Sequence, residues 1–314
     1  MAPGRAGEHG GPRHVRAVRV HRAPPLPPPP RPGGRSLMEL PDPLRLRTEF
    51  AEEARSERPG LARLCLLVGA VADPARGEPG IDAAEVELDR LAGELPHRPA
   101  TPRDWALALA ELLGTRYGFH GTESDYRRLE SSLLQEVLRR RRGLPILLSV
   151  VWLEVARRAG APVHGVALPG HFTVGFGPPD DLVLADPFDG GTLLSPADAS
   201  LLVTGVTGAP LDPSLLRPAD PLEVIRRVLN NIRAWAAARP ERTDVALWAV
   251  ELSLLLPSHP ADLRYEHAQL LVKCGDFVRG ARELESYAEV VAAVDPEAAE
   301  LVRGQARAAR ARLN

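Results

Sequence analysis

The chain has 314 residues, a formal net charge of −2, 44% hydrophobic residues and 25% charged residues. This is a globular composition with enough apolar residues for a buried core, and it provides no global positive charge for binding nucleic acid. Two cysteines, Cys65 and Cys274, are too few for a disulfide framework or an all-cysteine zinc site, which fits a reducing cytoplasm. The uncharged stretches are too short or too interrupted by glycine and proline to span a membrane.

Residues 1–37 differ in composition from the rest of the chain. They contain nine prolines, seven arginines and one acidic residue, Glu8. Such a segment cannot bury enough apolar surface to offset the entropy lost on ordering, so we predict a disordered, basic tail with polyproline character. Two interpretations stay open: a docking arm, or a start codon assigned too early, with translation beginning at Met38.

A block of helices is predicted next, from apolar periodicity and from the prolines and cap residues at the helix ends. The predicted helices cover residues 44–55, 61–71 and 82–95, and a further one begins at 101–102. Cys65 lies inside the second of them, so we expect a buried thiol rather than a reactive one, and we expect Cys274 to be buried and remote from the site as well.

The centre of the chain contains two predicted helices separated by a run of arginines. The first covers about residues 125–140 and is followed by Gly143; residues 139–142 are all arginine. Cations favour a helix C-terminus and charge runs are usually solvated, so we expect these arginines on an exposed face. Pro145 suits the first position of the second helix, 146–158, which is apolar on nearly all sides and therefore predicted to be buried.

The hydrophobic period then changes from 3.6 to 2, which predicts three short antiparallel strands at residues 162–168, 171–176 and 182–186. His171 opens the second strand and Asp186 closes the third, so neighbouring strands bring both to one edge of the sheet. A carboxylate beside a histidine fixes its tautomer and stabilises the imidazolium, which is half of a Cys-His-Asp apparatus.

A metal site at this edge is an alternative. His164 and His171 lie on adjacent strands, with Asp186 and Asp189 near, but no tight ligand spacing such as H-x-x-x-H is present, so we expect no metal. The other histidines considered are scattered and expected at the surface: His97, His120, His259 and His267.

The last hundred residues are predicted to be helical. The helices cover residues 221–239, 243–256, 262–273 and 278–294, with a final one after 295–296. A helix, a Gly-Asp-Phe turn at 275–277 and a second helix ending before Asp-Pro resemble a tetratricopeptide unit, with about one and a half repeats present. Because fewer than about three repeats rarely stand alone, we expect this part to pack on the core.

Four motifs in the centre of the chain together resemble the transglutaminase-like superfamily, and more narrowly its SirB-type branch. They are Arg-Arg-Gly-Leu-Pro at 141–145, Leu-Glu-Val-Ala-Arg-Arg at 153–158, Leu-Pro-Gly-His-Phe at 168–172 and Asp-Pro-Phe at 186–188. The resemblance implies an α+β fold: a papain-like core in which a buried helix packs on a small antiparallel sheet, flanked by N-terminal helices and a C-terminal tetratricopeptide-like segment. We therefore expect a transglutaminase-like domain at 38–205 and a helical tetratricopeptide-like domain at 220–314.

Catalytic members of the superfamily carry a cysteine at the start of the buried helix, a histidine at the start of one strand and an aspartate at the end of the next. The resemblance places His171 and Asp186 on the last two positions. Counting back from the Gly-x-Pro turn at 160–162 places the cysteine position on Pro145, which has no nucleophile. The chain also departs from the branch at residues 127–130, where an Asp-Pro-x-Asn stretch is expected. The candidate cleft residues are Arg142, Gly143, Pro145, Gly170 and Phe172.

Two classes of function remain open. The first, favoured by the missing thiol, is a non-catalytic protein whose cleft and helical tail bind a protein or peptide. The second is a hydrolase or acyl-transfer enzyme that uses His171 and Asp186 with another nucleophile, such as activated water. Ser149 is expected to be a small buried hydroxyl that bonds a backbone carbonyl. Neither class implies a cofactor, a nucleic acid or a membrane.

Overall fold

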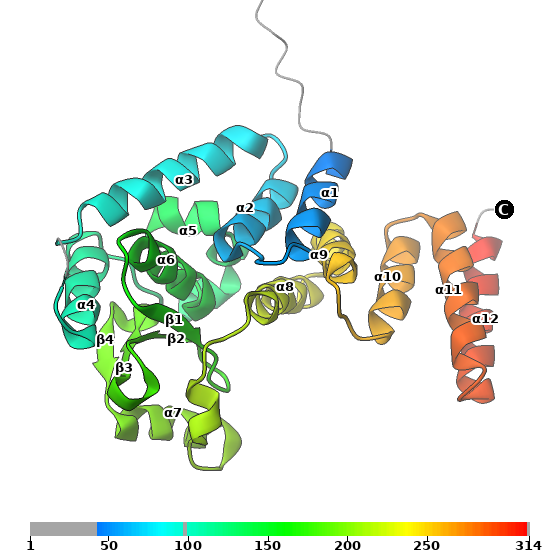
Figure 1. Ribbon diagram of the computed structural model, residues 1–314. Helices are drawn as coiled ribbons and strands as arrows, with labels where there is room; N and C mark the ends of the chain where they lie inside the picture. Colours follow the sequence, from blue (N-terminus) through cyan, green and yellow to red (C-terminus); the bar gives the residue numbers. More distant parts are fainter. Residues whose placement is uncertain (1–42, 97–98, 313–314) are drawn as a thin grey trace, which may run out of the picture. The chain divides into compact units, whose positions relative to one another are not determined.

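The computed structural model describes residues 43–96 and 99–312, so the tail predicted at 1–37 lies outside the described residues. In the described part, helices precede and follow one small antiparallel sheet (Figure 1). This confirms the predicted α+β class and its buried helix on a sheet. No helix in this part of the chain is both long and apolar enough to cross a bilayer.

The N-terminal helices follow the predicted pattern of apolar faces and caps. They are α1 (Pro43–Ala54), α2 (Leu61–Ala72), α3 (Gly77–Gly93) and α4 (Pro102–Leu109). Thr101 begins α4 in a capping box with Asp104, in which each side chain accepts from the other's backbone N–H. α4 continues into a π-helical segment, η1 (Ala110–Arg116).

The prediction of a single helix at 125–140 is wrong. Two 3₁₀ turns, η2 (Glu123–Arg127) and η3 (Leu129–Ser132), precede a shorter helix, α5 (Leu134–Arg140). The buried Asp125 side chain accepts hydrogen bonds from the Thr122 backbone at 2.9 Å and from the Ser131 hydroxyl at 3.2 Å. These local side-chain bonds compete with helical backbone bonds, so the apolar periodicity does not continue as one helix.

Helix α6 (Pro145–Arg158) is the central element. Pro145 occupies its first turn, and every residue from Pro145 to Ala156 is buried, as predicted. Its neighbour is the sheet, which has the order β1 (Val163–Val166), β2 (Thr173–Phe176), β3 (Val183–Asp186) and β4 (Thr192–Leu194), antiparallel throughout. The fourth strand was not expected from the sequence.

The two faces of the sheet bury different partners. Val174, Phe176 and Ala185 join the main core, which includes the residues of α6. The other face packs Val166 and Leu184 against α7 (Pro196–Thr207), a helix that was not expected either. The sheet is therefore a layer between α6 and α7, as Figure 1 shows.

Five helices complete the chain. They are α8 (Pro221–Ala237), α9 (Thr243–Leu255), α10 (Asp262–Lys273), α11 (Phe277–Val291) and α12 (Pro296–Ala311). Apolar residues of α8, α9 and the start of α10 belong to the main core, so the expected packing of this part on the core is present. α10, α11 and α12 share a smaller core of their own, built mainly from alanine.

Candidate functional site

The structure brings His171 and Asp186 together. His171 Nε2 lies 2.8 Å from Asp186 Oδ2, and the two side chains are 15% and 10% exposed. The hydrogen bond expected from the sequence is therefore present. Asp186 ends β3, whereas His171 lies two residues before β2 rather than opening it. No described residue hydrogen-bonds His171 Nδ1, so that nitrogen is free to meet a ligand or water.

A tight turn and an arginine from α8 explain why His171 stands outside the strand. Gly170 has a φ of +69°, which glycine adopts without strain, and the His171 backbone N–H donates to the Leu168 carbonyl at 3.2 Å. The Arg227 guanidinium donates to the Leu168 carbonyl at 3.3 Å and to the His171 carbonyl at 3.1 Å. It also lies 5.5 Å from the ring centre of Phe172. Burial lowers the pKa of Arg227, and the neighbouring Arg226 lowers it further.

Aromatic rings surround the pair. The Phe188 ring meets the His171 imidazole edge to face at 6.4 Å and the Tyr126 ring at 6.3 Å. Asp186 Oδ1 accepts from the Phe188 backbone N–H at 2.9 Å, which orients the carboxylate. Gly121 provides the space, because a Cβ there would lie 2.0 Å from the Phe188 ring. Burial raises the pKa of the half-exposed Tyr126, and the Asp186 charge raises it further, which places the phenol near that carboxylate.

The start of α6 offers no nucleophilic side chain. Gly143 and Pro145 are buried, and so is Phe172, at 1% exposure. The Ser149 hydroxyl, one turn along α6, donates to the Phe172 carbonyl at 3.1 Å, so it is the buried, backbone-bonded hydroxyl that was expected. This bond also places the first turns of α6 beside the segment that carries His171.

Neither thiol lies at the site. Cys65 is buried at 1% exposure, and burial raises its pKa strongly, so it is inert as expected. The expectation that Cys274 is buried as well is wrong: it caps α10 and is exposed. Partial burial of the thiol and the negative charges of Asp244 and Glu251 raise the pKa of Cys274, which lowers its reactivity at neutral pH.

The expectation of exposed arginines at 139–142 holds only for Arg139, whose side chain is 61% exposed. The side chains of Arg140, Arg141 and Arg142 are 17%, 26% and 32% exposed, and each pairs with a carboxylate.

Arg142 is part of a polar cluster. Its guanidinium lies 3.5 Å from the Asp125 carboxylate, donates to the Thr122 hydroxyl at 3.3 Å and contacts His120 Nε2. Asp125 is 2% exposed, so it needs this cation. The cluster adjoins the aromatic rings, because the Gly121 backbone N–H donates to the Phe188 carbonyl at 2.9 Å.

The remaining histidines are separate from the pair. His164 and Asp189 do not join it, and the described residues contain no group of three His, Cys, Asp or Glu side chains suited to a metal ion. Burial lowers the pKa of His164. His267, expected at the surface, is 7% exposed and bonds Glu283, because the hairpin of α10 and α11 covers it. His97 lies outside the described residues.

Tyr126, Phe188 and Arg227 are the site residues that sequence reasoning missed. Phe188 had a usable signal, since it directly follows Asp186-Pro187 and must lie near the carboxylate. No sequence signal pointed to Tyr126 or Arg227. Arg227 lies 56 residues from His171 in the chain, and only the fold brings the two together.

Comparison with known proteins gives two matches that divide the chain. A family model described as the transglutaminase-like superfamily matches residues 82–230, and a tetratricopeptide repeat model matches residues 232–314. A UPF0162 protein of Xylella fastidiosa (strain Temecula1) is 34% identical over 168 residues, which are 51% of this chain and 60% of the relative. A UPF0162 protein of Vibrio cholerae is 27% identical over 194 residues, 60% of this chain and 71% of the relative.

A shorter match reaches eukaryotic proteins. F-box only protein 21 of Mus musculus is 37% identical over 65 residues, which are 21% of this chain and 10% of that protein. The chain thus spans 60% of the length of the Xylella relatives and a small part of the F-box protein. The similarity to the transglutaminase-like superfamily thus covers residues 82–230.

Proposed function

We propose that this chain, which matches the transglutaminase-like superfamily over residues 82–230 and is similar to the UPF0162 proteins, is a non-catalytic protein that binds a protein or peptide partner. The observation that carries the proposal is the start of α6. By the count from the Gly-x-Pro turn, Pro145 stands at the position of the nucleophilic cysteine, and the Ser149 hydroxyl is already bonded to a carbonyl. Without a nucleophile, the His171–Asp186 pair can orient a ligand but cannot form an acyl-enzyme.

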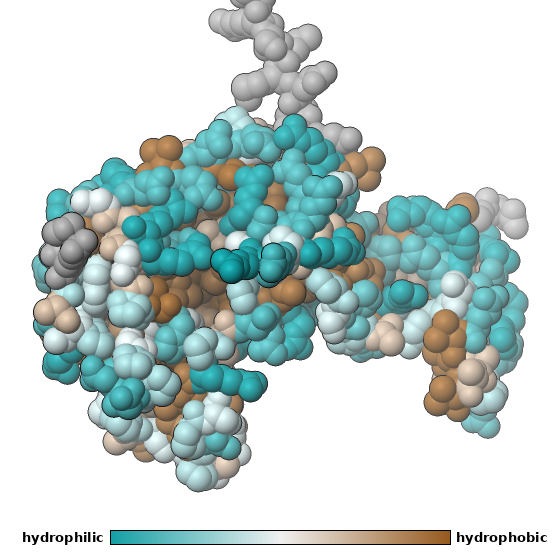
Figure 2. All heavy atoms as spheres, viewed as in Figure 1, coloured by the Kyte–Doolittle hydropathy of each residue, from teal (hydrophilic) through white to brown (hydrophobic). Residues whose placement is uncertain are grey.

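The tetratricopeptide region supports a macromolecular partner. A groove of about 590 Å³ at α10 and α11 is lined by Leu254, Tyr287 and Val290, and Val290 is 64% exposed. Arg264 lines the same groove and forms no ion pair with any described residue. Figure 2 shows apolar side chains gathered at one end of the α11–α12 hairpin, where Val294 is 89% exposed. Exposed apolar surface beside a free cation suits a protein-binding site.

The test is capture of a partner from an extract of the native cell by the immobilised full chain. We expect Val290→Glu to abolish retention and Val278→Glu to preserve it. Both valines lie on α11 with nearly equal exposure, 64% and 63%, and only Val290 lines the groove. Equal retention by both variants counts against the groove. Turnover of an amide substrate that disappears in His171→Ala contradicts the non-catalytic proposal.

One observation favours a second candidate function, a hydrolase that activates water. Asp186 holds His171 Nε2, while Nδ1 has no partner among the described residues. An imidazole held in this way is placed to act as a general base toward a water molecule. This candidate is weaker because the position of the missing nucleophile is buried.

Introducing a thiol tests the alignment that both candidates use. In a Cys274→Ser background, we expect Pro145→Cys to react with iodoacetamide faster than Ser149→Cys, one turn further along α6. The reason is that a thiol at a helix start beside His171 ionises more readily than one inside the helix. Equal rates for the two variants, measured by mass spectrometry of the intact chain, contradict the count to Pro145.

A further inference from the structure

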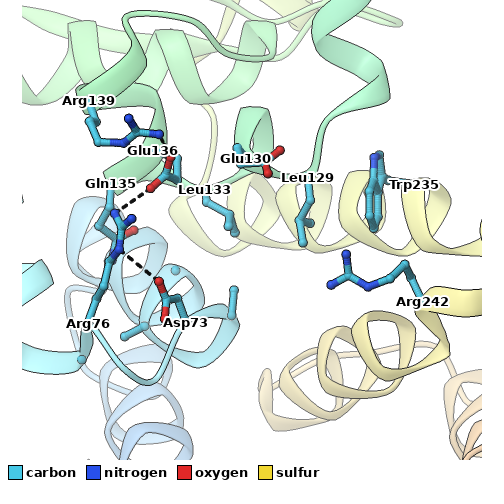
Figure 3. A pocket seen from close by; sticks show the side chains of 14 residues that line it. Asp73, Arg76, Leu129, Glu130, Leu133, Gln135, Glu136, Arg139, Trp235 and Arg242 are labelled. Atoms are coloured by element: carbon cyan, nitrogen blue, oxygen red, sulfur yellow. Dashed lines mark hydrogen bonds and ion pairs between the residues drawn. The ribbon is translucent and has the colours of Figure 1, made fainter.

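A second pocket shares no lining residue with the His171–Asp186 site. It encloses about 430 Å³ and is lined by the end of α2, η3, α5, the end of α8 and Arg242 (Figure 3). Leu129, Leu133 and Trp235 provide its apolar surface. The volume lies within the range of pockets that hold small ligands or single peptide side chains with their neighbours.

The Trp235 side chain is held in place by contacts within the protein. Its indole N–H donates to the Arg127 carbonyl at 2.9 Å, and the Arg239 guanidinium, 4.3 Å from the ring centre, donates to the same carbonyl at 3.1 Å. A ring held in place loses little conformational entropy when an apolar group packs on it. Trp235 is therefore a pre-organised surface for an apolar side chain.

The charges on the opposite wall neutralise one another. Arg76 pairs with Asp73 at 3.0 Å and with Glu136 at 2.7 Å, and Glu136 also pairs with Arg139 at 2.6 Å. Figure 3 shows these four side chains as a column on the side of the pocket away from Trp235. Two acids and two bases cancel, so this wall presents no net charge to a ligand.

Three polar groups of the lining lack a full set of partners. The Glu130 carboxylate forms no hydrogen bond or ion pair with any described residue. Arg242 pairs with Asp244 at 3.4 Å, and its guanidinium lies 5.4 Å from the centre of the Trp235 ring. Gln135 donates its amide N–H to the Leu66 carbonyl at 2.7 Å, while its Oε1 is buried and accepts no hydrogen bond. This oxygen packs against Gly69, so a ligand in the pocket would pair with Glu130 and Arg242 instead.

We propose that this pocket binds a peptide segment of a partner protein in which an apolar side chain stands between a basic and an acidic residue. The apolar side chain packs on Trp235 and the two leucines. The basic residue meets Glu130 and the acidic residue meets Arg242, which lie on opposite sides of Leu129 in Figure 3. The inference rests on the proposed function, because it states the chemistry of a peptide partner.

The test is an NMR titration of the full chain, read at the Trp235 indole N–H, which Trp235→Phe assigns. The probes are the blocked peptides acetyl-Lys-Leu-Glu-amide and acetyl-Glu-Leu-Lys-amide, their uncharged analogue acetyl-Gln-Leu-Gln-amide, and free leucine. We expect a saturable shift with at least one charged peptide, at a severalfold lower concentration than with the uncharged one. Leu129→Ala is expected to weaken both.

Charge variants test the two ends of the pocket separately. Glu130→Gln is expected to weaken the charged peptide by about twofold to fivefold, the range of an exposed ion pair, and to leave the uncharged peptide unchanged. Arg242→Gln should weaken the charged peptide by a similar factor and by more than the uncharged one, although it also removes a guanidinium from beside the Trp235 ring. Glu241→Gln and Arg103→Gln are matched controls, because both residues are exposed and neither lines the pocket. They should leave every titration as it is.

Three results overturn the inference: no saturable shift with any peptide, equal affinity for charged and uncharged peptides, or an effect of free leucine as strong as that of the peptides. His171→Ala and Val290→Glu are expected to leave this titration unchanged. The NMR titration therefore tests peptide binding at this pocket, and the partner capture tests the proposed function separately.

Discussion

At the residue scale, the position of His171 depends on contacts that come from outside its own hairpin. Asp186 holds the imidazole, but Arg227 of α8 holds the backbone on both sides of the Pro169–Gly170 turn. No described carboxylate pairs with this guanidinium, so its hydrogen bonds go to carbonyl oxygens. This half-buried arginine, which has no carboxylate partner among the described residues, therefore stabilises the turn before His171.

Replacing this arginine is expected to move His171. Arg227→Ala removes two charged hydrogen bonds and should lower the free energy of unfolding by about 1.5–3 kcal/mol, measured by urea denaturation. It should also shift the His171 imidazole resonances. Arg226→Ala is the matched control, since that side chain is 48% exposed with a loose partner at 3.9 Å, and it should change stability by less than about 0.5 kcal/mol. Unchanged His171 resonances in Arg227→Ala contradict the positioning role.

At the element scale, a partly buried chain of charges joins four helices. Arg47 of α1 pairs with Glu251 of α9, and His267 of α10 lies 3.7 Å from Glu251 and 2.6 Å from Glu283 of α11. Burial lowers the pKa of His267, but the two glutamates raise it by more, so the net direction is upward. Burial raises the pKa of Glu251, and His267 and Arg47 outweigh it, so that pKa is lowered.

This chain predicts a pH dependence of stability. Because the pKa of His267 is raised in the folded state, its contribution is complete below the ordinary value of 6.5 and is lost as the pH rises through the folded value. The free energy of unfolding of the wild type should therefore exceed that of His267→Gln by about 1.5–3 kcal/mol near pH 6, and the difference should shrink as the pH rises through the folded pKa of His267. Glu283→Gln should also weaken the pH dependence of stability, whereas Glu289→Gln, at an exposed position of the same helix, should leave it unchanged. A pH-independent difference in urea midpoints contradicts the linkage.

At the scale of the whole molecule, the main core joins the first described helix to helices of the last third of the chain. Leu46 and Phe50 of α1 are at most 1% exposed and share a core with Val228 of α8 and Val250 of α9. The first helix is therefore needed for folding, even though the family-model match begins only at residue 82. Burying one such large side chain contributes about 1.5–3 kcal/mol.

Two truncations distinguish the contribution of residues 1–37 to stability from that of α1. Composition alone predicts that removing residues 1–37 leaves the melting temperature unchanged within error, because such a segment cannot contribute to a core. Removing residues 1–54 instead takes α1 with it and should lower the melting temperature by many degrees, since Leu46 and Phe50 are lost. A drop of several degrees after the shorter truncation shows that the tail docks.

The sequence by itself was sufficient for the features that depend on near neighbours in the chain. Apolar periodicity, prolines and caps located most helices, including the buried α6. The His171–Asp186 bond was predictable because the two residues lie fifteen apart across one hairpin, so strand pairing brings them together. The transglutaminase-like motifs added the packing of helix on sheet.

Only the tertiary structure decided what depends on distant partners. Cys274 is exposed and His267 is buried because of how the last helices pack, which no local pattern reveals. Arg227 reaches His171 from another helix, and the second pocket combines segments from α2 to Arg242. Short-range preferences select the elements, but burial and ion pairing follow from which elements meet in space, and that choice is a property of the whole fold.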